Sequence, residues 1–361
     1  MNFNLPLDHK PYIDKYFLRA KEVLQKENLN PTVKAQVFIR KGNCKVFGIN
    51  ETIAILMKYA NTNNLKINTL KEGDIFQPSE TLMTIEAPIQ NIIDLETMYL
   101  GVLSAETTKQ NDNIDIDLKA IEQNMRVIVD LVKGRPVSYF GARHWRYDAD
   151  ASIAHSCFQG GAQSCSTDAG ADTISTKGIG TIPHALECIY HWKYGIKRAV
   201  VESTKAFDKH MDKVIPRIAL IDYANREISD TLQTIYEVPN LYGIRIDTCG
   251  ENKMQGCFIP SDKEEPFVFD NGVSVFGATL LREVLDKNYK IMLSSGFGNP
   301  EKVKVFLEAE KDLGHSIFDG LGVGGVFTSR MATMDIIEVD GQVIHKVGRL
   351  PKPSTRLIKV I

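Results

Sequence analysis

From residue 136 onwards the sequence alternates between short apolar runs and longer amphipathic segments, and this alternation constrains the fold more than any other feature. Repeated strand–helix units require parallel strands joined by right-handed crossovers, in an open doubly wound sheet or a closed barrel. Many consecutive units occur without a second glycine-rich nucleotide fingerprint, which favours a barrel. The expected strands are residues 137–140, 198–201, 217–221, 242–246, 291–293 and 317–321. The expected helices are residues 184–194, 207–214, 227–236, 277–288 and 301–313.

The residues before 136 have a mixed pattern that predicts a small α+β domain. Helices are expected over 11–30, 52–59 and 92–103, and strands over 33–39, 66–70 and 81–86. The polar stretch 107–117 is the candidate domain boundary, although a loop inside a helical layer is the plainer alternative because helical spacing resumes over 114–132. The chain ends in an expected hairpin, 335–339 and 342–347, across Asp340-Gly341.

Composition excludes several classes of function. The chain of 361 residues is 43% hydrophobic and 24% charged, with a formal net charge of -2, which argues against a dedicated nucleic-acid binder but leaves room for an anionic small substrate. We expect no signal peptide and no membrane span, because no charged n-region precedes an apolar run and no window is apolar enough. The 6 cysteines form no C-x-x-C pair, so we expect a cytoplasmic protein without a structural zinc site.

Charged and glycine-rich residues follow the expected strands, where the ligand crevice of a parallel sheet lies. In the strand that begins at Leu241, Arg245 and Asp247 are two residues apart and should share a face. An ion pair that closes the sheet end is the plain interpretation, but the arrangement recurs after other strands. These residues are Arg143, His144, Glu202, Asp222, Arg245, Asp247, Thr248, Ser295, Gly296, Phe297, Gly322, Val323, Gly324 and Gly325.

The two late glycine-rich turns are where a barrel usually holds a phosphate on bare backbone N–H groups. Asn299-Pro300 suits the start of a helix in that role. Each signal has a plain alternative: the turns could be chain reversals, Asp222 and Glu202 could cap helices, and Arg143 could lie on a solvated edge. Because the signals coincide at one expected rim, we favour a site that handles phosphate.

His184 follows a glycine-rich stretch and Pro183, so it lies in the first turn of an expected helix. A histidine satisfied by backbone is the plain interpretation, and an imidazole that accepts or holds a phosphoryl group is the alternative. Tyr16 is most simply part of the core of the first helix. Gln163 lies in a polar loop of small residues without decisive chemistry.

The motifs Phe140-Gly141-Ala142-Arg143, Gly180-Thr181-Ile182-Pro183-His184-Ala185, Leu220-Ile221-Asp222, Gly243-Ile244-Arg245-Ile246-Asp247 and Gly322-Val323-Gly324, in this order, resemble those of nicotinate phosphoribosyltransferases, most closely the shorter archaeal-type branch. The resemblance covers nearly the whole chain. It implies a type II phosphoribosyltransferase fold of class α/β. An N-terminal α/β sandwich domain (1–110) would pack on an irregular, about seven-stranded α/β barrel (111–332), with the C-terminal hairpin (333–361) returning to the first domain.

The resemblance also implies a reaction. Nicotinate would react with 5-phosphoribosyl-1-pyrophosphate to give nicotinate mononucleotide and pyrophosphate in NAD biosynthesis. ATP would be a co-substrate and magnesium would accompany the pyrophosphate, with no protein metal ligand assigned. The protein would act as a homodimer with shared active sites, or as a higher oligomer.

The resemblance implies roles for individual residues. Arg245 would hold the pyridine ring and its carboxylate, with Tyr16 of a partner subunit on the other face. Arg143 would bind pyrophosphate or the substrate edge, and His184 matches a histidine that family members phosphorylate. Asp222 and Asp247 would hold ribose hydroxyls or magnesium, and the glycines of the late turns would bind the 5-phosphate. His144, Gln163, Glu202 and Thr248 complete the expected substrate-binding set.

The sequence departs from the family pattern at two places. The run from Arg143 to Asp148 replaces an expected second arginine and a histidine–proline pair, and Gln163 stands where an aspartate is common. Quinolinate and nicotinamide phosphoribosyltransferases and a non-catalytic phosphoribosyl-binding homologue are therefore the alternatives. A dicarboxylate such as quinolinate would call for a denser cluster of cations than Arg143, His144 and Arg245 provide.

Overall fold

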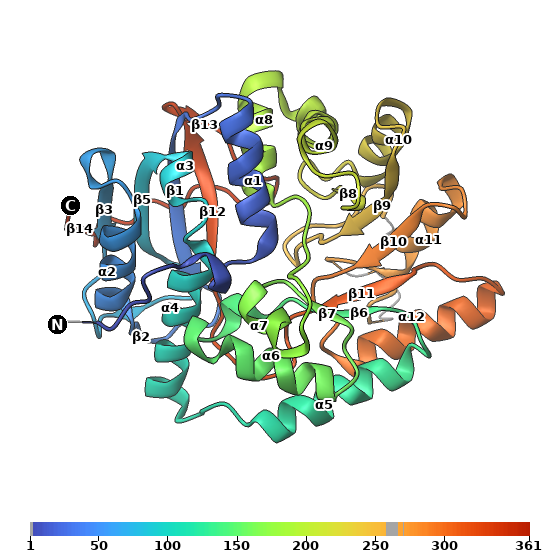
Figure 1. The fold of residues 1–361 in the computed structure, drawn as a ribbon, viewed down its shortest axis with the longest axis horizontal. Helices are drawn as coiled ribbons and strands as arrows, with labels where there is room; N and C mark the ends of the chain where they lie inside the picture. The colour runs from blue at the N-terminus through green and yellow to red at the C-terminus, as the bar shows by residue number, and fades with distance from the viewer. Residues whose placement is uncertain (1–2, 258–265, 270) are drawn as a thin grey trace.

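Two six-stranded sheets form the body of the protein. Figure 1 shows how they are arranged. The structure is a computed structural model that describes residues 3–257, 266–269 and 271–361. One sheet is antiparallel, with the order β13-β12-β1-β5-β3-β14, and the other has the order β7-β6-β11-β10-β9-β8. A short pair, β2 (Cys44–Lys45) and β4 (Ile75–Phe76), lies apart from both.

The antiparallel sheet joins the two ends of the chain. Its strands are β1 (Thr32–Ile39), β3 (Lys66–Thr69), β5 (Thr81–Pro88), β12 (Ala332–Val339), β13 (Gln342–Val343) and β14 (Ile358–Lys359). The central strand β1 pairs with β5 on one side and with β12 on the other. The predicted hairpin across Asp340-Gly341 is present, and both residues have the positive φ that such a tight turn needs. Its second strand ends at Val343, earlier than predicted.

Helices cover this sheet and lead towards the second one. They are α1 (Lys15–Lys26), α2 (Ile49–Tyr59), α3 (Ile89–Ile92), α4 (Glu96–Asp112) and α5 (Leu118–Leu131). The helix α4 is buried along most of its length and continues through the polar stretch, because Thr107 and Thr108 bond to backbone carbonyls. It ends where Asn113 takes a left-handed conformation. Residue 110, our predicted domain limit, therefore lies in the last turn of α4.

The second sheet is parallel throughout, as the strand–helix alternation predicted. Its strands are β6 (Val137–Tyr139), β7 (Ser164–Cys165), β8 (Arg217–Leu220), β9 (Leu241–Ile246), β10 (Lys290–Leu293) and β11 (Gly320–Val323). The accompanying helices are α6 (Asp150–Gln159), α7 (Asp168–Ala171), α8 (His184–Tyr194), α9 (Ala199–His210), α10 (Glu227–Glu237), α11 (Val275–Val284) and α12 (Pro300–Leu313). None of the helices in the described parts of the chain is long and apolar enough to cross a membrane.

One predicted strand is wrong. Residues 199–201 form the start of helix α9, because their apolar run continues at helical spacing to the buried Ser203, Thr204 and Phe207. Of the helix predicted over 207–214, residues 207–210 are instead the end of α9, and residues 211–214 follow it outside any helix. The last parallel strand also lies slightly later than predicted, at β11.

A loop occupies the place where a further strand would close the sheet into a barrel. The amide of Ile179 donates to Cys165 O of β7 at 2.9 Å. The hydroxyl of Thr181, two residues later, donates to Ile218 O of β8 at 2.7 Å. The loop thus bridges the two edge strands of a curled six-stranded sheet. The predicted fold class is confirmed, with an irregular loop in place of one strand.

Candidate active site

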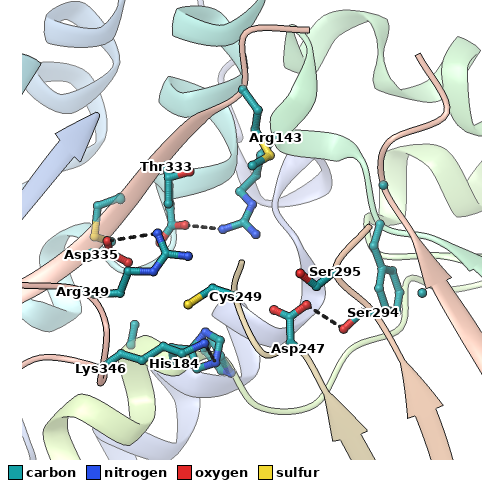
Figure 2. A pocket seen from close by; sticks show the side chains of 18 of the residues that line it. Arg143, His184, Asp247, Cys249, Ser294, Ser295, Thr333, Asp335, Lys346 and Arg349 are labelled. Carbon is teal, nitrogen blue, oxygen red and sulfur yellow. Dashed lines mark hydrogen bonds and ion pairs between the residues drawn. The ribbon is translucent and has the colours of Figure 1, made fainter. Parts of the chain in front are cut away.

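A cavity of about 630 Å³ lies between the carboxyl ends of the parallel strands and strand β12 of the antiparallel sheet. Figure 2 shows labelled side chains that point into it from several sides: Arg143, His184, Asp247, Ser294, Ser295, Asp335, Lys346 and Arg349. Most of the predicted site residues line it together: Tyr16, Arg143, His144, His184, Arg245, Asp247, Ser295, Gly296, Gly322, Gly324 and Gly325. The predicted convergence of strand ends at one rim is therefore present.

Arg245 and Asp247 share a face of β9, as their spacing predicted. Arg245 Nη1 lies 3.6 Å from Asp247 Oδ2 and 3.3 Å from the hydroxyl of Ser294. That hydroxyl donates to Asp247 Oδ1 at 2.7 Å, so strand β10 fixes the carboxylate of its neighbour β9. Arg245 Nη2 also approaches Ile182 O of the bridging loop at 3.3 Å. These contacts hold a guanidinium and a carboxylate in one wall of the cavity.

The two glycine-rich turns present backbone to the cavity. Ser295 and Gly296 both have positive φ, which glycine adopts without strain. A Cβ on Gly322 would lie 2.6 Å from the ring of Phe140, so only a bare backbone fits there. Beyond the first turn, Asn299 Oδ1 accepts from the amide of Glu301 at 3.0 Å and caps α12, as predicted.

Two residues of these turns do not offer their side chains to a ligand. Phe297 is 1% exposed and packs edge-to-face on Phe306. Val323 is fully buried in the core. Only their backbone could contact a ligand, because both side chains are packed inside the sheet–helix layer.

His184 begins helix α8 and contacts a buried ion pair. Its Nε2 lies 3.0 Å from Asp222 Oδ1 and 3.1 Å from Lys346 Nζ. Lys346 also donates to Asp222 Oδ2. Burial, with the charge of Lys346, lowers the pKa of His184 below its ordinary value, although Asp222 opposes this shift. Asp222 is fully buried and is not among the lining residues of the cavity, whereas both of its partners are.

Arg143 faces the cavity rather than a solvated edge, which corrects one of the plain alternatives. Its Nη1 lies 2.7 Å from Glu96 Oε1, at the start of α4. Burial raises the pKa of Glu96 to about 7 even though Arg143 opposes the shift. Burial, with the charge of Arg143, lowers the pKa of His144 to about 4, so this imidazole is neutral. Tyr16 lines the same cavity of its own chain and packs against Gly180 of the bridging loop.

The unusual run after Arg143 connects the two sheets. Trp145 is 2% exposed and packs edge-to-face on Phe327. Arg146 makes a double hydrogen bond with Glu51 of α2, each at 2.9 Å, and pairs with Glu106 of α4 at the same distance. His144 of this run lines the cavity, whereas Trp145 and Arg146 have a structural role away from it.

Three predicted site residues lie elsewhere. Glu202 is on helix α9, where it pairs with Arg198 and Lys205, because the strand expected before it is a helix. Gln163 accepts from the amide of Val137 at 2.8 Å, at the amino end of β6 and away from the cavity. Thr248 is fully buried and donates to Glu227 at 2.9 Å.

Several cavity residues were missed by sequence reasoning because they come from the antiparallel sheet or from segments next to it. Arg40 follows β1, Glu96 begins α4, Asp335 lies in β12, and Lys346 and Arg349 follow β13. Arg349 is in contact with Asp335 Oδ2 at 3.7 Å and with Glu251 Oε2 at 3.6 Å. In sequence these residues stand in ordinary strand and loop contexts, so no local signal marked them.

The residues do not form a metal centre of their own. Within the described ranges, no group of three histidine, cysteine or acidic side chains is arranged to hold a metal ion. The carboxylates that line the cavity are Glu96, Asp247, Glu251 and Asp335. All 6 cysteines are free thiols.

The fold and this site together define the class of the protein: a phosphoribosyltransferase-type α/β fold with its cavity at the carboxyl ends of a parallel sheet. Residues 14–106 match the family model described as the quinolinate phosphoribosyl transferase N-terminal domain. A search of curated proteins found no match.

Solved structures refine this class to the fold of nicotinate phosphoribosyltransferases. A Saccharomyces cerevisiae protein whose structure is named as a nicotinate phosphoribosyltransferase is 15% identical to this chain. Its TM-score is 0.69, over 96% of this chain and 94% of its own. The Porphyromonas gingivalis enzyme is 15% identical, with a TM-score of 0.63 over 93% of this chain and 92% of its own. A nicotinate-nucleotide pyrophosphorylase from Pyrococcus furiosus is 26% identical over 97% of this chain and 82% of its own, with a TM-score of 0.46. The resemblance inferred from the motifs is thus confirmed as a fold, and the archaeal-type branch stays a prediction.

Proposed function

We propose that the protein is a nicotinate phosphoribosyltransferase that joins nicotinate to 5-phosphoribosyl-1-pyrophosphate and releases pyrophosphate. The observation that carries the proposal is one cavity that holds Arg245 and Tyr16 for an aromatic acid together with two bare glycine turns for a phosphate. A guanidinium can pair with a carboxylate and stack on a ring, and backbone N–H groups suit a phosphate.

In this proposal the protein positions charges and does little acid–base chemistry. The ring nitrogen attacks the ribose C1 as pyrophosphate leaves, through an oxocarbenium-like state. Asp247, held by Ser294, places a carboxylate near the sugar, and Arg143 places a cation near the departing pyrophosphate. Magnesium bound to the pyrophosphate would neutralise part of its charge.

We further propose that ATP drives the reaction through phosphorylation of His184, whose lowered pKa keeps the imidazole neutral. The place of this reaction in NAD biosynthesis and the action as a homodimer belong to the same proposal. Tyr16 already reaches the cavity of its own chain, so the cavity has its tyrosine without a partner subunit.

Quinolinate phosphoribosyl transfer is the second candidate, because the N-terminal match carries that family's description. The cavity also has more cations than the sequence placed there, with Arg40, Lys346 and Arg349 added. Each of these three contacts a carboxylate, however: Glu251 for both arginines and Asp222 for the lysine. Each added cation therefore already has an acidic partner within the protein, which favours the monoacid.

The decisive experiment offers the purified protein labelled phosphoribosyl pyrophosphate with nicotinate, quinolinate or nicotinamide, with and without ATP. We expect a mononucleotide product only when nicotinate is the pyridine substrate. We also expect this product to form faster when ATP is present. Turnover of quinolinate with release of carbon dioxide would replace our proposal by the second candidate. Binding of the sugar pyrophosphate without any product would identify a non-catalytic homologue.

A variant ties the activity to this cavity. Arg245→Ala should lose nearly all turnover, more than about 100-fold, because the carboxylate of nicotinate loses its cationic partner and the side chains of Ser294 and Asp247 lose a neighbour. Arg126→Ala is the matched control, because this arginine is half-exposed on α5 and pairs only within its own helix and with Gln159. Full activity of Arg245→Ala would place the chemistry elsewhere.

A further inference from the structure

Beside His184 lies Lys346, a buried lysine of the cavity wall to which the proposed chemistry gives no role. The side chain of Lys346 is 5% exposed and that of Asp222 is 0% exposed, whereas the side chain of His184 is 28% exposed. Lys346 reaches this place from the segment after β13, in the antiparallel half of the molecule, whereas Asp222 follows β8 of the parallel sheet. His184 and Lys346 both line the cavity, where Figure 2 shows their side chains next to each other, whereas Asp222 is not among the lining residues.

Both partners contact the same nitrogen of His184. Asp222 Oδ1 requires a proton on Nε2, whereas Lys346 Nζ at 3.1 Å could donate only to an unprotonated Nε2. The two contacts therefore favour opposite tautomers. Lys346 also donates to Asp222 Oδ2, a short charge-assisted contact that leaves Oδ1 directed at His184. In the tautomer with its proton on Nε2, the carboxylate accepts that proton, and Nδ1 has no hydrogen-bond partner among the residues described.

We propose that Lys346 is a positioning residue for His184: by holding the second oxygen of Asp222, it keeps the imidazole uncharged, protonated at Nε2, and open to the cavity at Nδ1. The inference deepens the proposed function, because it names the nitrogen of His184 that would accept a phosphoryl group. In that step the Nδ1 lone pair forms a bond to the γ-phosphorus of ATP as the bond from that phosphorus to the bridging oxygen breaks. ADP leaves with the electron pair, and the Nε2 proton stays on Asp222's side of the ring.

The charges around His184 support this role. Asp222, Asp247 and Lys346 face it from the segments after β8, β9 and β13, and Glu187 lies one turn later on its own helix α8. Burial raises the pKa of Glu187 well above its ordinary value, which favours the uncharged form of this carboxyl. Lys346 lowers the pKa of His184, whereas Asp222 and Asp247 raise it. Without Lys346 the two acids would act unopposed, and the imidazole would become an imidazolium with a proton on Nδ1.

The test follows His184 directly by ¹⁵N NMR of the full chain labelled at histidine, with the signal assigned from its loss in His184→Asn. In the wild type we expect the Nε2–H tautomer at neutral pH. In Lys346→Met the pKa of His184 should rise by at least about one unit, and Lys346→Arg, which keeps the charge, should restore most of the wild-type value. Lys311→Met, at an exposed position on α12, is the control and should leave the titration unchanged.

Two results would overturn the inference: an Nδ1–H tautomer in the wild type, which needs no variant to fold, or an unchanged or lowered pKa in a folded Lys346→Met. Phosphoryl transfer is measured separately with γ-³²P-labelled ATP. We expect labelling of the wild type at pH 7 and less labelling in Lys346→Met, because fewer imidazoles are neutral there. Absence of labelling in a wild type that shows the predicted tautomer would reject the ATP coupling of the proposed function and leave the positioning role of Lys346 supported.

Discussion

Arg143, which follows strand β6 of the parallel sheet, reaches Glu96 at the start of α4, with 2.7 Å between Nη1 and Oε1. Glu96 is 3% exposed, and burial raises its pKa to about 7 in spite of the arginine. The carboxyl is therefore half charged near neutral pH. When it is protonated, Arg143 keeps its full positive charge for an anionic ligand, and when it ionises, the arginine is engaged within the protein.

This relationship predicts a pH dependence of substrate binding. Below pH 7 the neutral Glu96 leaves Arg143 available, so the KM for phosphoribosyl pyrophosphate should be low, and it should rise as the pH passes 7. In Glu96→Gln the rise should be absent, because the amide does not ionise. Steady-state kinetics from pH 6 to pH 8.5 on both proteins provide the check. A wild-type and a variant profile of equal shape would show that Glu96 does not control this arginine.

Asp150 predicts a pH dependence of stability. It is 1% exposed, and burial, reinforced by the charge of Asp14, raises its pKa to about 7 although Thr167 donates to it. The folded state therefore binds an extra proton between the ordinary aspartate pKa and pH 7. The stabilisation is full below that range and is lost as the pH rises through 7.

Asp150→Asn should remove this dependence. We compare the free energy of unfolding of the variant with that of the wild type. The difference, variant minus wild type, should increase by an amount on the order of 4 kcal/mol between pH 4 and pH 8, because the two pKa values of Asp150 differ by about three units. Urea unfolding at a series of pH values measures it. Asp130→Asn, at an exposed position on α5, shows what an ordinary carboxyl-to-amide exchange contributes. A constant difference between Asp150→Asn and wild type would mean that the buried carboxyl is charged throughout.

The sequence was informative where function depends on local pattern. The alternation of strands and helices predicted the parallel sheet, and the spacing of Arg245 and Asp247 predicted their shared face. It failed for residues 199–201, because a short apolar run fits a buried helix face as well as a strand. Glu202 was misplaced by the same error.

The cavity residues that come from the antiparallel sheet and its neighbouring segments could not be predicted from local sequence patterns. Lys346 and Arg349 enter it because β12, more than two hundred residues after β1, pairs with that strand and carries the following segment across to the parallel sheet. Such long-range pairing leaves no trace in the spacing of nearby residues. The family pattern also did not predict the ion pairs of Arg146, whose partners Glu51 and Glu106 lie on α2 and α4.

Arg146 predicts a stability effect at the junction of the two sheets. Arg146→Met would leave the carboxylates of Glu51 and Glu106 without their shared cation, and the side chain of Glu51 is only 10% exposed. We expect a loss of about 3 kcal/mol in the free energy of unfolding, because an unpaired buried charge is costly. Arg126→Met, which removes a half-exposed pair with Glu122, should cost less than about 1 kcal/mol. Equal losses in the two variants, measured by urea unfolding, would contradict a structural role for the unusual run.

Arg349 predicts an effect on substrate binding that comes from outside the parallel sheet. Its side chain is 11% exposed, and its Nε and Nη1 have no hydrogen-bond partner in the described part of the protein, although Asp335 and Glu251 are within ion-pair range. Buried donors of this kind are costly unless a ligand satisfies them. Arg349→Met should therefore raise the KM for phosphoribosyl pyrophosphate by about tenfold with a smaller change in kcat, because the contact is already made in the ground state. Arg356→Met, a half-exposed arginine that pairs with Glu80, is the control. A fall in kcat at constant KM would instead assign Arg349 to the transition state, and no change in either constant would exclude it from the substrate site.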